Sequence, residues 1–187
     1  MAADWSALDS GVVPHWRDCA AVGKTQPVWV VIPSIDRPET LCDTTLRLCR
    51  RHGIQMHRVA VFVTPGHVAG QSETEEARYK RTLAARGFGR VRIVMGGSGL
   101  ERQMARARAW VGLNGYMVTM SDRVSDYKEG YYLGGASDRV CLRSLPLGSL
   151  PRIIQHGYQL LQSGGFAAWS VSPSHVTFHL RPDRLSR

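Results

Sequence analysis

The chain has 187 residues, of which 43% are hydrophobic, and it carries a formal net charge of +9. This length and hydrophobic content favour a folded domain with its own core over a disordered chain. No apolar run approaches the roughly 20 residues needed to span a bilayer, and the N-terminal segment lacks the basic-then-apolar order of a secretory signal. We therefore expect a cytoplasmic protein without a membrane segment.

The first element of regular structure follows an irregular N-terminal arm, residues 1–27. Val28–Ile32 is a short apolar run between two prolines, a pattern typical of a strand that is buried on both faces. The helix after it is expected to begin at Asp36, because Glu39 follows three residues later with the spacing of a capping box. Gly53 is the expected end of this helix.

Strands and helices alternate from there to residue 120. Short apolar runs predict the strands, and helical spacing of apolar residues predicts the helices. The next predicted elements are the strand Arg58–Val63, the helix Glu73–Ala85, the strand Val91–Met95, the helix Leu100–Val111 and the strand Tyr116–Met120. This order predicts a mostly parallel sheet with right-handed crossovers and helices on both faces.

The last third of the sequence departs from this alternation. We expect a polar loop from residue 121 through Gly135, a helix over Ser149–Ser163, and two short strands at Ala167–Val171 and Val176–Leu180. The expected fold is a single-domain, Rossmann-like α/β protein, with one domain over residues 28–187 after the N-terminal arm.

Positive charge is concentrated between residues 78 and 108, and most of it comes from arginine. The planar guanidinium binds phosphate through two parallel hydrogen bonds. Tyrosines also interleave with cations after residue 122, a pattern that suits stacking on exposed bases. We therefore expect DNA or another polyanion as a partner, the alternative being an ordinary solvated surface. The expected nucleic-acid contacts are Arg78, Lys80, Arg81, Arg106 and Tyr131.

The four cysteines form no Cys-x-x-Cys pair and have no histidines at ligand spacing nearby. The sequence therefore predicts neither a zinc site nor a disulfide between Cys42 and Cys49. We expect the cysteines to be small buried hydrophobic residues.

Polar residues follow the first and fourth predicted strands, at the carboxyl ends where open α/β sheets bind ligands. Gly96–Gly99 follows the third strand, but no dinucleotide fingerprint, P-loop or Gly-x-Ser-x-Gly elbow is present in the sequence. Arg102 and Arg106, four residues apart beyond these glycines, are further candidates for phosphate. The strand-end candidates are Pro33, Ser34, Asp36 and Arg37 after the first strand, and Ser121, Asp122, Arg123 and Asp126 after the fourth.

Four segments, taken in order, resemble the GT-A glycosyltransferases. Val30–Leu41 resembles their opening strand with its Ile-Pro-Ser loop, and Gly99–Gln103 resembles a segment that carries Gly-Ile, two residues, then Arg-Asn. Tyr116–Val124 falls where they carry a strand ending in Asp-Asp-Asp, and Ala167–Pro173 resembles a later Trp-Gly element. The order over Val28–Leu180 resembles most the small glycosyltransferases associated with hydroxymethyl-pyrimidine DNA, in phages and in base J synthesis.

The resemblance implies a GT-A-like domain that moves a sugar from a UDP-sugar donor to a hydroxymethylated base in DNA, in a bacterium or a phage-infected cell. The base would have to be extruded from its stack for the reaction. Asp122 and Asp126 are the implied catalytic residues, and Asp122 is the implied ligand of Mn²⁺ or Mg²⁺. The implied donor-nucleotide contacts are Pro33, Ser34, Asp36, Arg37, Arg102 and Arg123.

The loop after the fourth strand departs from the family pattern, because Ser121-Asp122-Arg123 stands where the family has three acidic residues. Three interpretations remain open. Arg123 meets the diphosphate in place of a metal ion, Asp126 supplies a metal ligand from a shifted loop, or the site is inactive and the fold serves binding alone. A polar loop that bonds its own backbone is the plain alternative for both carboxylates.

Two other classes of function compete with glycosyl transfer. One is a non-catalytic GT-A-like module that binds nucleic acid or builds a structure such as a phage particle, with a degenerate metal site. The other is a nucleotide-binding regulator of the doubly wound type, which fits the strand order but lacks a phosphate loop.

Overall fold

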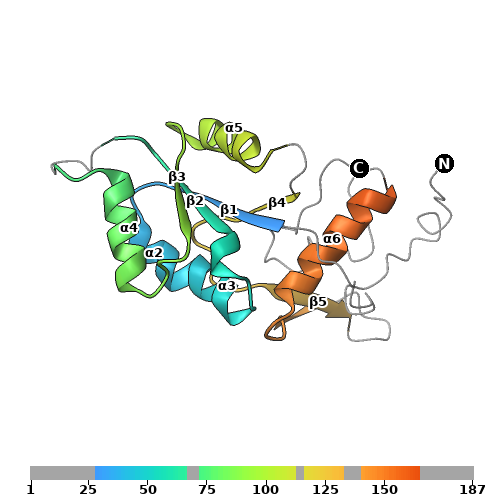
Figure 1. The fold of residues 1–187 in the computed structure, drawn as a ribbon. Helices are drawn as coiled ribbons and strands as arrows, with labels where there is room; N and C mark the ends of the chain where they lie inside the picture. The colour runs from blue at the N-terminus through green and yellow to red at the C-terminus, as the bar shows by residue number, and fades with distance from the viewer. Residues whose placement is uncertain (1–27, 67–71, 113–115, 133–139, 165–187) are drawn as a thin grey trace. The chain divides into compact units, whose positions relative to one another are not determined.

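Four parallel strands with helices between them confirm the α/β prediction (Figure 1). The computed structural model describes residues 28–66, 72–112, 116–132 and 140–164. The chain divides between Asp126 and Tyr127 into two compact units. The first unit contains the strands β1 (Val28–Ser34), β2 (Val59–Val63), β3 (Arg92–Met95) and β4 (Tyr116–Thr119) and the helical segments α2 (Pro38–Leu41), η1 (Cys42–Leu46), α3 (Arg47–Arg51), η2 (Met56–Arg58), α4 (Glu75–Ala85) and α5 (Leu100–Val111).

The sheet of the first unit has the strand order β3-β2-β1-β4, and all of its neighbouring strands are parallel. Each crossover between consecutive strands contains helical segments, as parallel pairing requires. The chain leaves β1 towards β2 and β3 on one side and then returns to place β4 on the other. This reversal makes the carboxyl ends of β1 and β4 a topological switch point, the place where open α/β sheets bind ligands.

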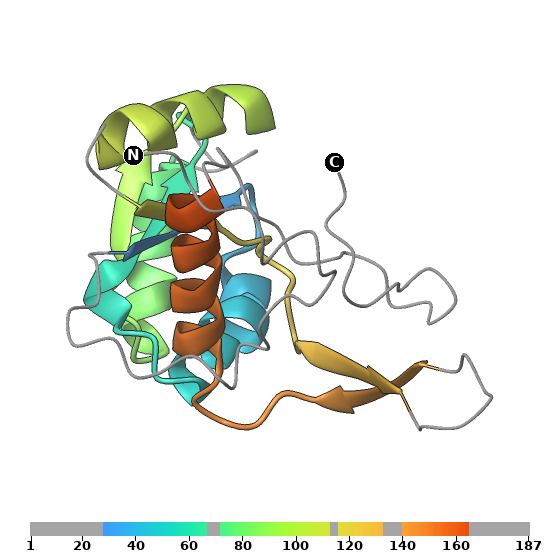
Figure 2. The same cartoon turned by 90° about the vertical axis from the view of Figure 1, so that its right-hand side faces the viewer.

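Helices cover both faces of this sheet, as the sequence predicts. α5 lies on one face, and α2, α3 and α4 lie on the other (Figures 1 and 2). On the α5 side, Val31, Ala60 and Phe62 form a buried cluster with Ala107. Every residue of β2 is buried, which agrees with an uninterrupted apolar strand covered on both faces.

The first crossover begins differently from the expected capping box. Arg37 is the N-cap residue of α2, and no side chain caps that end of the helix. Asp36 has a left-handed backbone with a φ of 52°, and its carboxylate pairs with Arg78 of α4, as does the carboxylate of Glu39. The capping-box prediction is therefore wrong, because a cation distant in sequence takes both carboxylates.

The first crossover also contains a π-helical turn, η1, between α2 and α3. Such turns reorient side chains and are frequent at functional sites. Here the turn carries Thr44 and Thr45 to the loop after β4. The predicted end is confirmed, because His52 is the C-cap residue of α3 and Gly53 follows with a φ of 79°.

Most other predicted boundaries in the first unit match the structure closely. α5 has the predicted ends, and β1 continues beyond the predicted strand to Ser34. α4 begins at Glu75 instead of Glu73, because the side chain of Thr74 caps the helix by accepting from Ala77 N at 3.2 Å.

The second unit contains an antiparallel ribbon, β5 (Lys128–Tyr132) with β6 (Val140–Ser144), and the helix α6 (Leu150–Gly164). The ribbon corrects the prediction of a polar loop through Gly135. A polar, glycine-containing segment has little strand signal of its own, and pairing with a partner strand makes it extended.

The helix α6 confirms the helix predicted over Ser149–Ser163, with each end shifted by one residue. The predicted arm 1–27 and the predicted strands Ala167–Val171 and Val176–Leu180 lie outside the described residues. Within the described part of the chain, no helix is both long and apolar enough to cross a membrane.

Cys42 and Cys49 are free thiols buried in the first unit, as expected. Burial raises the pKa of Cys42 to about 11 and that of Cys49 to about 12. Both thiols therefore stay protonated at neutral pH and act as small apolar groups.

Candidate functional site

The switch point between β1 and β4 brings together three of the predicted site residues, Ser34, Arg37 and Asp122. Ser34 is the last residue of β1, and its hydroxyl donates to Asp122 Oδ2 at 2.9 Å. Arg37 Nε lies 3.6 Å from the same oxygen. Ser34 is 2% exposed and Asp122 is 6% exposed, so a hydroxyl and a guanidinium together compensate a carboxylate that is almost removed from water.

Tyr79 of α4 extends these contacts into a directional chain of hydrogen bonds. The backbone N–H of Arg37 donates to Tyr79 Oη at 3.0 Å. Because Ser34 gives its proton to Asp122, the 2.7 Å contact between Tyr79 Oη and Ser34 Oγ has the tyrosine as its donor. Tyr79 is 0% exposed, and its burial raises the pKa of the phenol. These hydrogen bonds therefore connect a neutral tyrosine, through the hydroxyl of Ser34, to the side chain of Asp122.

The π-helical turn η1 fixes the backbone of the loop that carries Asp122. Thr45 Oγ1 donates to the carbonyl oxygen of Ser121 at 2.7 Å and accepts from the backbone N–H of Val124 at 2.9 Å. Thr44 Oγ1 lies 2.9 Å from the carbonyl oxygen of Asp122. Thr45 thus holds the residues on both sides of the carboxylate, and Thr44, whose hydroxyl also lies 2.6 Å from the carbonyl oxygen of Thr40, contacts the backbone of Asp122 itself.

The surroundings of Asp122 do not fit the divalent cation that the resemblance implies. Its Oδ2 already contacts a hydroxyl and a guanidinium, and a cation there would repel Arg37. Among the described residues, no group of three or more His, Cys, Asp or Glu side chains is placed to hold a metal ion. Within the described part of the chain, Arg37 and the exposed Arg123 are cations of this strand end, and Oδ1 is the oxygen of Asp122 that accepts no hydrogen bond there.

The other predicted donor-site residues lie in β1, in the loop after it and on α5. Pro33 belongs to β1 itself, opposite Phe62 of β2, and Asp36 pairs with Arg78. Arg102 is exposed on the first turn of α5, and its neighbour Gln103 donates to Thr64 Oγ1, just after β2, at 3.3 Å. A side chain at Gly97 would bring a Cβ within 2.5 Å of Arg102 Cβ, so this turn needs glycine for the close approach of the helix.

Glu75 is a buried carboxyl at the start of α4 that sequence reasoning missed. The residue is 8% exposed, and its Oε2 has no hydrogen-bond partner within the described structure. Burial raises the pKa of this carboxyl, the nearby carboxylates of Asp36 and Glu39 raise it further, and Arg78 opposes them. Glu75 therefore holds its proton more tightly than an ordinary glutamate does.

The predicted catalytic residue Asp126 is exposed and acts electrostatically on His52. His52 is 2% exposed, and its Nδ1 has no hydrogen-bond partner among the described residues. Burial lowers the pKa of this histidine, Arg51 lowers it further, and Asp126 opposes both. A neutral imidazole at pH 7 follows from these effects.

Three of the predicted nucleic-acid contacts on α4 take part in ion pairs. Lys80 Nζ lies 2.6 Å from Glu76 Oε1, and Arg81 Nη2 lies 2.8 Å from Glu73 Oε2. Arg78 pairs with two carboxylates, those of Asp36 and Glu39. Of the remaining two, Arg106 is exposed on α5, and Tyr131 lies in β5 of the second unit.

Two features of the sequence point to the missed residues. Glu75, Tyr79 and Leu83 are spaced by four and mark the inner face of α4, and a buried tyrosine on such a face needs a partner for its hydroxyl. Two adjacent threonines inside a helix, Thr44 and Thr45, likewise need acceptors for their hydroxyls. The identity of those partners depends on the tertiary fold.

Comparison with known proteins identifies no relative of this chain, so its function is interpreted from the geometry of the site. No protein-family model matches the chain, and neither a curated protein nor a solved structure matches it.

Proposed function

We propose that the switch-point site binds the diphosphate of a nucleotide sugar and that the protein is a glycosyltransferase that modifies a hydroxymethylated base in DNA. The observation that carries this proposal is the assembly of Ser34, Arg37 and Asp122 at the carboxyl ends of β1 and β4. This is where open α/β sheets bind nucleotides, and a carboxylate beside an arginine supplies both a proton acceptor and a phosphate contact.

The proposed reaction uses the two sides of this assembly differently. Oδ1 of Asp122 accepts the proton of the acceptor hydroxyl, whose oxygen attacks the anomeric carbon of the sugar. The bond between that carbon and the diphosphate oxygen breaks, and UDP leaves with the electron pair. Arg37 and Arg123 stabilise the negative charge that grows on the diphosphate. The chain from Tyr79 through Ser34 keeps the carboxylate oriented for this step.

Nucleotide binding is expected to be independent of a divalent metal. Arginine takes the place that the metal ion has in the GT-A glycosyltransferases. Arg37 lies beside Asp122 and compensates its charge, and Arg123 is the next residue in the sequence. Of the three interpretations that the sequence leaves open, this favours the one in which an arginine meets the diphosphate. The proposal also places the protein in the cytoplasm, where nucleotide sugars and DNA are both available.

Calorimetric titration with UDP and UDP-glucose, in EDTA and in manganese, tests the first half of the proposal. We expect micromolar binding of both ligands with no gain from manganese. R37Q should weaken UDP binding about tenfold, since it removes a charged phosphate contact. R47Q is the matched control, because Arg47 is an exposed arginine of the same unit that lies on α3. Absence of UDP binding at millimolar concentration would refute the proposal.

Incubation of UDP-glucose with hydroxymethylated DNA tests the second half. We expect glucosylated product that is lost in D122N, because an amide cannot accept the hydroxyl proton. The non-catalytic module is the second candidate function, and it is favoured by the fact that Asp122 Oδ2 already accepts from Ser34 and lies beside Arg37. If the protein binds UDP but transfers no glucose to the DNA, the non-catalytic module is the better interpretation.

A further inference from the structure

At the amino-terminal ends of the strands, the indole ring of Trp29 contacts the guanidinium groups of Arg58 and Arg92. The Cζ atom of Arg58 lies 5.3 Å from the centroid of the Trp29 ring, and that of Arg92 lies 5.1 Å from the same centroid. Arg58 directly precedes β2, and Arg92 is the first residue of β3. Both distances are within the range of a cation–π interaction, which orders the two guanidiniums.

The C-terminal part of α5 borders this pair of arginines. Trp110 packs edge-on against Trp29, with the ring centroids 4.6 Å apart. Arg106 precedes Trp110 by one helical turn, so it lies on the same side of α5. Both tryptophans are half-buried, whereas Arg92 and Arg106 are exposed. We call these five residues the arginine–tryptophan patch.

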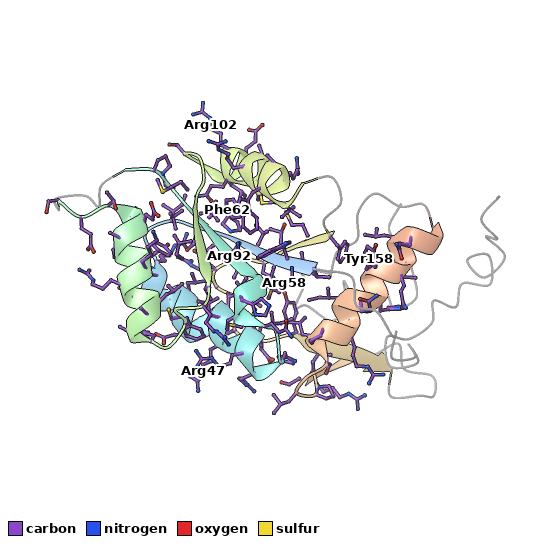
Figure 3. All side chains as sticks on the ribbon, in the orientation of Figure 1. Arg47, Arg58, Phe62, Arg92, Arg102 and Tyr158 are labelled. Carbon is purple, nitrogen blue, oxygen red and sulfur yellow. The ribbon has the colours of Figure 1, made fainter. Side chains whose placement is uncertain are left out.

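The cations of this patch differ from those of α4 in having no carboxylate partner. Lys80 and Arg81 each form an ion pair with a neighbouring glutamate, whereas none of the three patch arginines pairs with a carboxylate within the described residues. Arg102 and Arg108 are exposed on α5 as well, and Figure 3 shows Arg102 projecting from α5 away from the sheet. Among the described residues, the α5 side of the sheet therefore presents positive charge without a carboxylate partner beside two partly exposed aromatic rings.

We propose that the arginine–tryptophan patch binds the phosphate backbone of a nucleic acid. Guanidiniums that are already ordered lose little conformational entropy when they engage phosphate. The rings offer apolar surface for a neighbouring sugar or base, a combination used by proteins that hold single strands. The net charge of +9 has the sign that such a partner requires.

This proposal rests on the proposed function for its partner, since that function needs DNA near the switch point, but it assigns a different surface. The patch lies at the amino-terminal ends of the strands, and the nucleotide site lies at the carboxyl ends of β1 and β4. It also assigns the main phosphate contacts to Arg58 and Arg92 rather than to the paired cations of α4.

The test compares two double variants with the same change in charge. R58Q/R92Q removes the two ordered guanidiniums, and R47Q/R51Q removes two exposed arginines of α3, which lies on the other face of the sheet (Figure 3). Fluorescence anisotropy measures the affinity of each full-length variant for labelled single-stranded and duplex DNA across a salt series. For R58Q/R92Q we expect about a tenfold loss in affinity and a salt slope smaller by about two.

R47Q/R51Q should change the affinity by less than about threefold, because charge alone acts weakly at a distance in salt. A loss in R58Q/R92Q that is no larger than in R47Q/R51Q overturns the proposal. R106Q, an exposed helix position, should weaken binding without affecting the fold, and it decides the question if R58Q/R92Q unfolds. UDP titration of the same variants should be unchanged, so failure of the nucleotide site and failure of the patch are distinguishable.

Discussion

Buried polar groups around the switch point determine how its residues respond to pH. Glu75 has an oxygen without a hydrogen-bond partner and lies near the carboxylates of Asp36 and Glu39. Its pKa is raised, whereas a glutamate of the unfolded chain has a pKa of about 4.3. The carboxyl of Glu75 therefore stays protonated in the folded protein at pH values where it is ionised in the unfolded chain. Between these two pKa values the folded state binds more protons, so the free energy of unfolding decreases as pH rises.

E75Q keeps the shape of the side chain and removes the charge that burial opposes. We expect a melting temperature a few degrees above that of the parent at about pH 8, and little difference at about pH 4, where Glu75 is mostly protonated in both states of the parent. Thermal unfolding followed by circular dichroism across this range measures the effect. E76Q, which only breaks the surface pair with Lys80, should give no gain at either pH. A parent and an E75Q variant with parallel pH profiles would contradict the assignment.

At the scale of elements, the π-helical turn η1 links the first crossover to the fourth strand end. Thr45 is 0% exposed and satisfies a carbonyl oxygen and an N–H of the loop after β4. The turn therefore transmits the geometry of the helix directly to the backbone on both sides of Asp122. A rigid support of this kind is what a site needs if its carboxylate must be oriented for proton transfer.

T45V replaces the hydroxyl by a methyl group of similar size and leaves two backbone groups unsatisfied. We expect a loss of about 1–3 kcal/mol in the free energy of unfolding, measured by urea denaturation, together with weaker UDP binding. T40V is the control, because Thr40 is an exposed residue of the neighbouring segment α2 and its substitution should change stability by less than about 0.5 kcal/mol. Equal effects of the two substitutions would show that the turn does not support the loop.

At the scale of the whole molecule, the first unit contains everything that the proposed nucleotide site needs. Its sheet is covered by helices on both faces, and its core includes the fully buried strand β2. Ser34, Arg37, Tyr79 and Asp122 all belong to this unit, which spans Thr25–Asp126. A compact unit with its own hydrophobic core is expected to fold independently.

A fragment comprising residues 25–126 should therefore unfold cooperatively and bind UDP with the affinity of the full chain. A fragment that ends at residue 115 is the matched control. It lacks β4, so β1 loses its partner strand at Val28–Val31, and it lacks Asp122. We expect this shorter fragment to show neither a cooperative transition nor UDP binding. A non-cooperative transition in the longer fragment would show that its stability depends on the rest of the chain.

The sequence by itself determined the alternation of strands and helices in the first unit, the ends of α5 and the burial of Cys42 and Cys49. These follow from periodicity and capping, which involve neighbouring residues. It also placed Ser34 and Asp122 at strand ends, but those residues are 88 positions apart, so only the strand order β3-β2-β1-β4 decided that they meet.

The tertiary structure alone decided the partners of side chains. The carboxylate of Asp36, predicted to cap a helix, pairs with Arg78 instead. Lys128–Tyr132 forms a strand because it pairs with β6. The hydroxyl of Tyr79 contacts both Ser34 and the backbone of Arg37. The physical reason is common to all three. Local sequence determines which backbone conformations are low in free energy. Hydrogen bonds and ion pairs form only between groups that the packed chain brings close together.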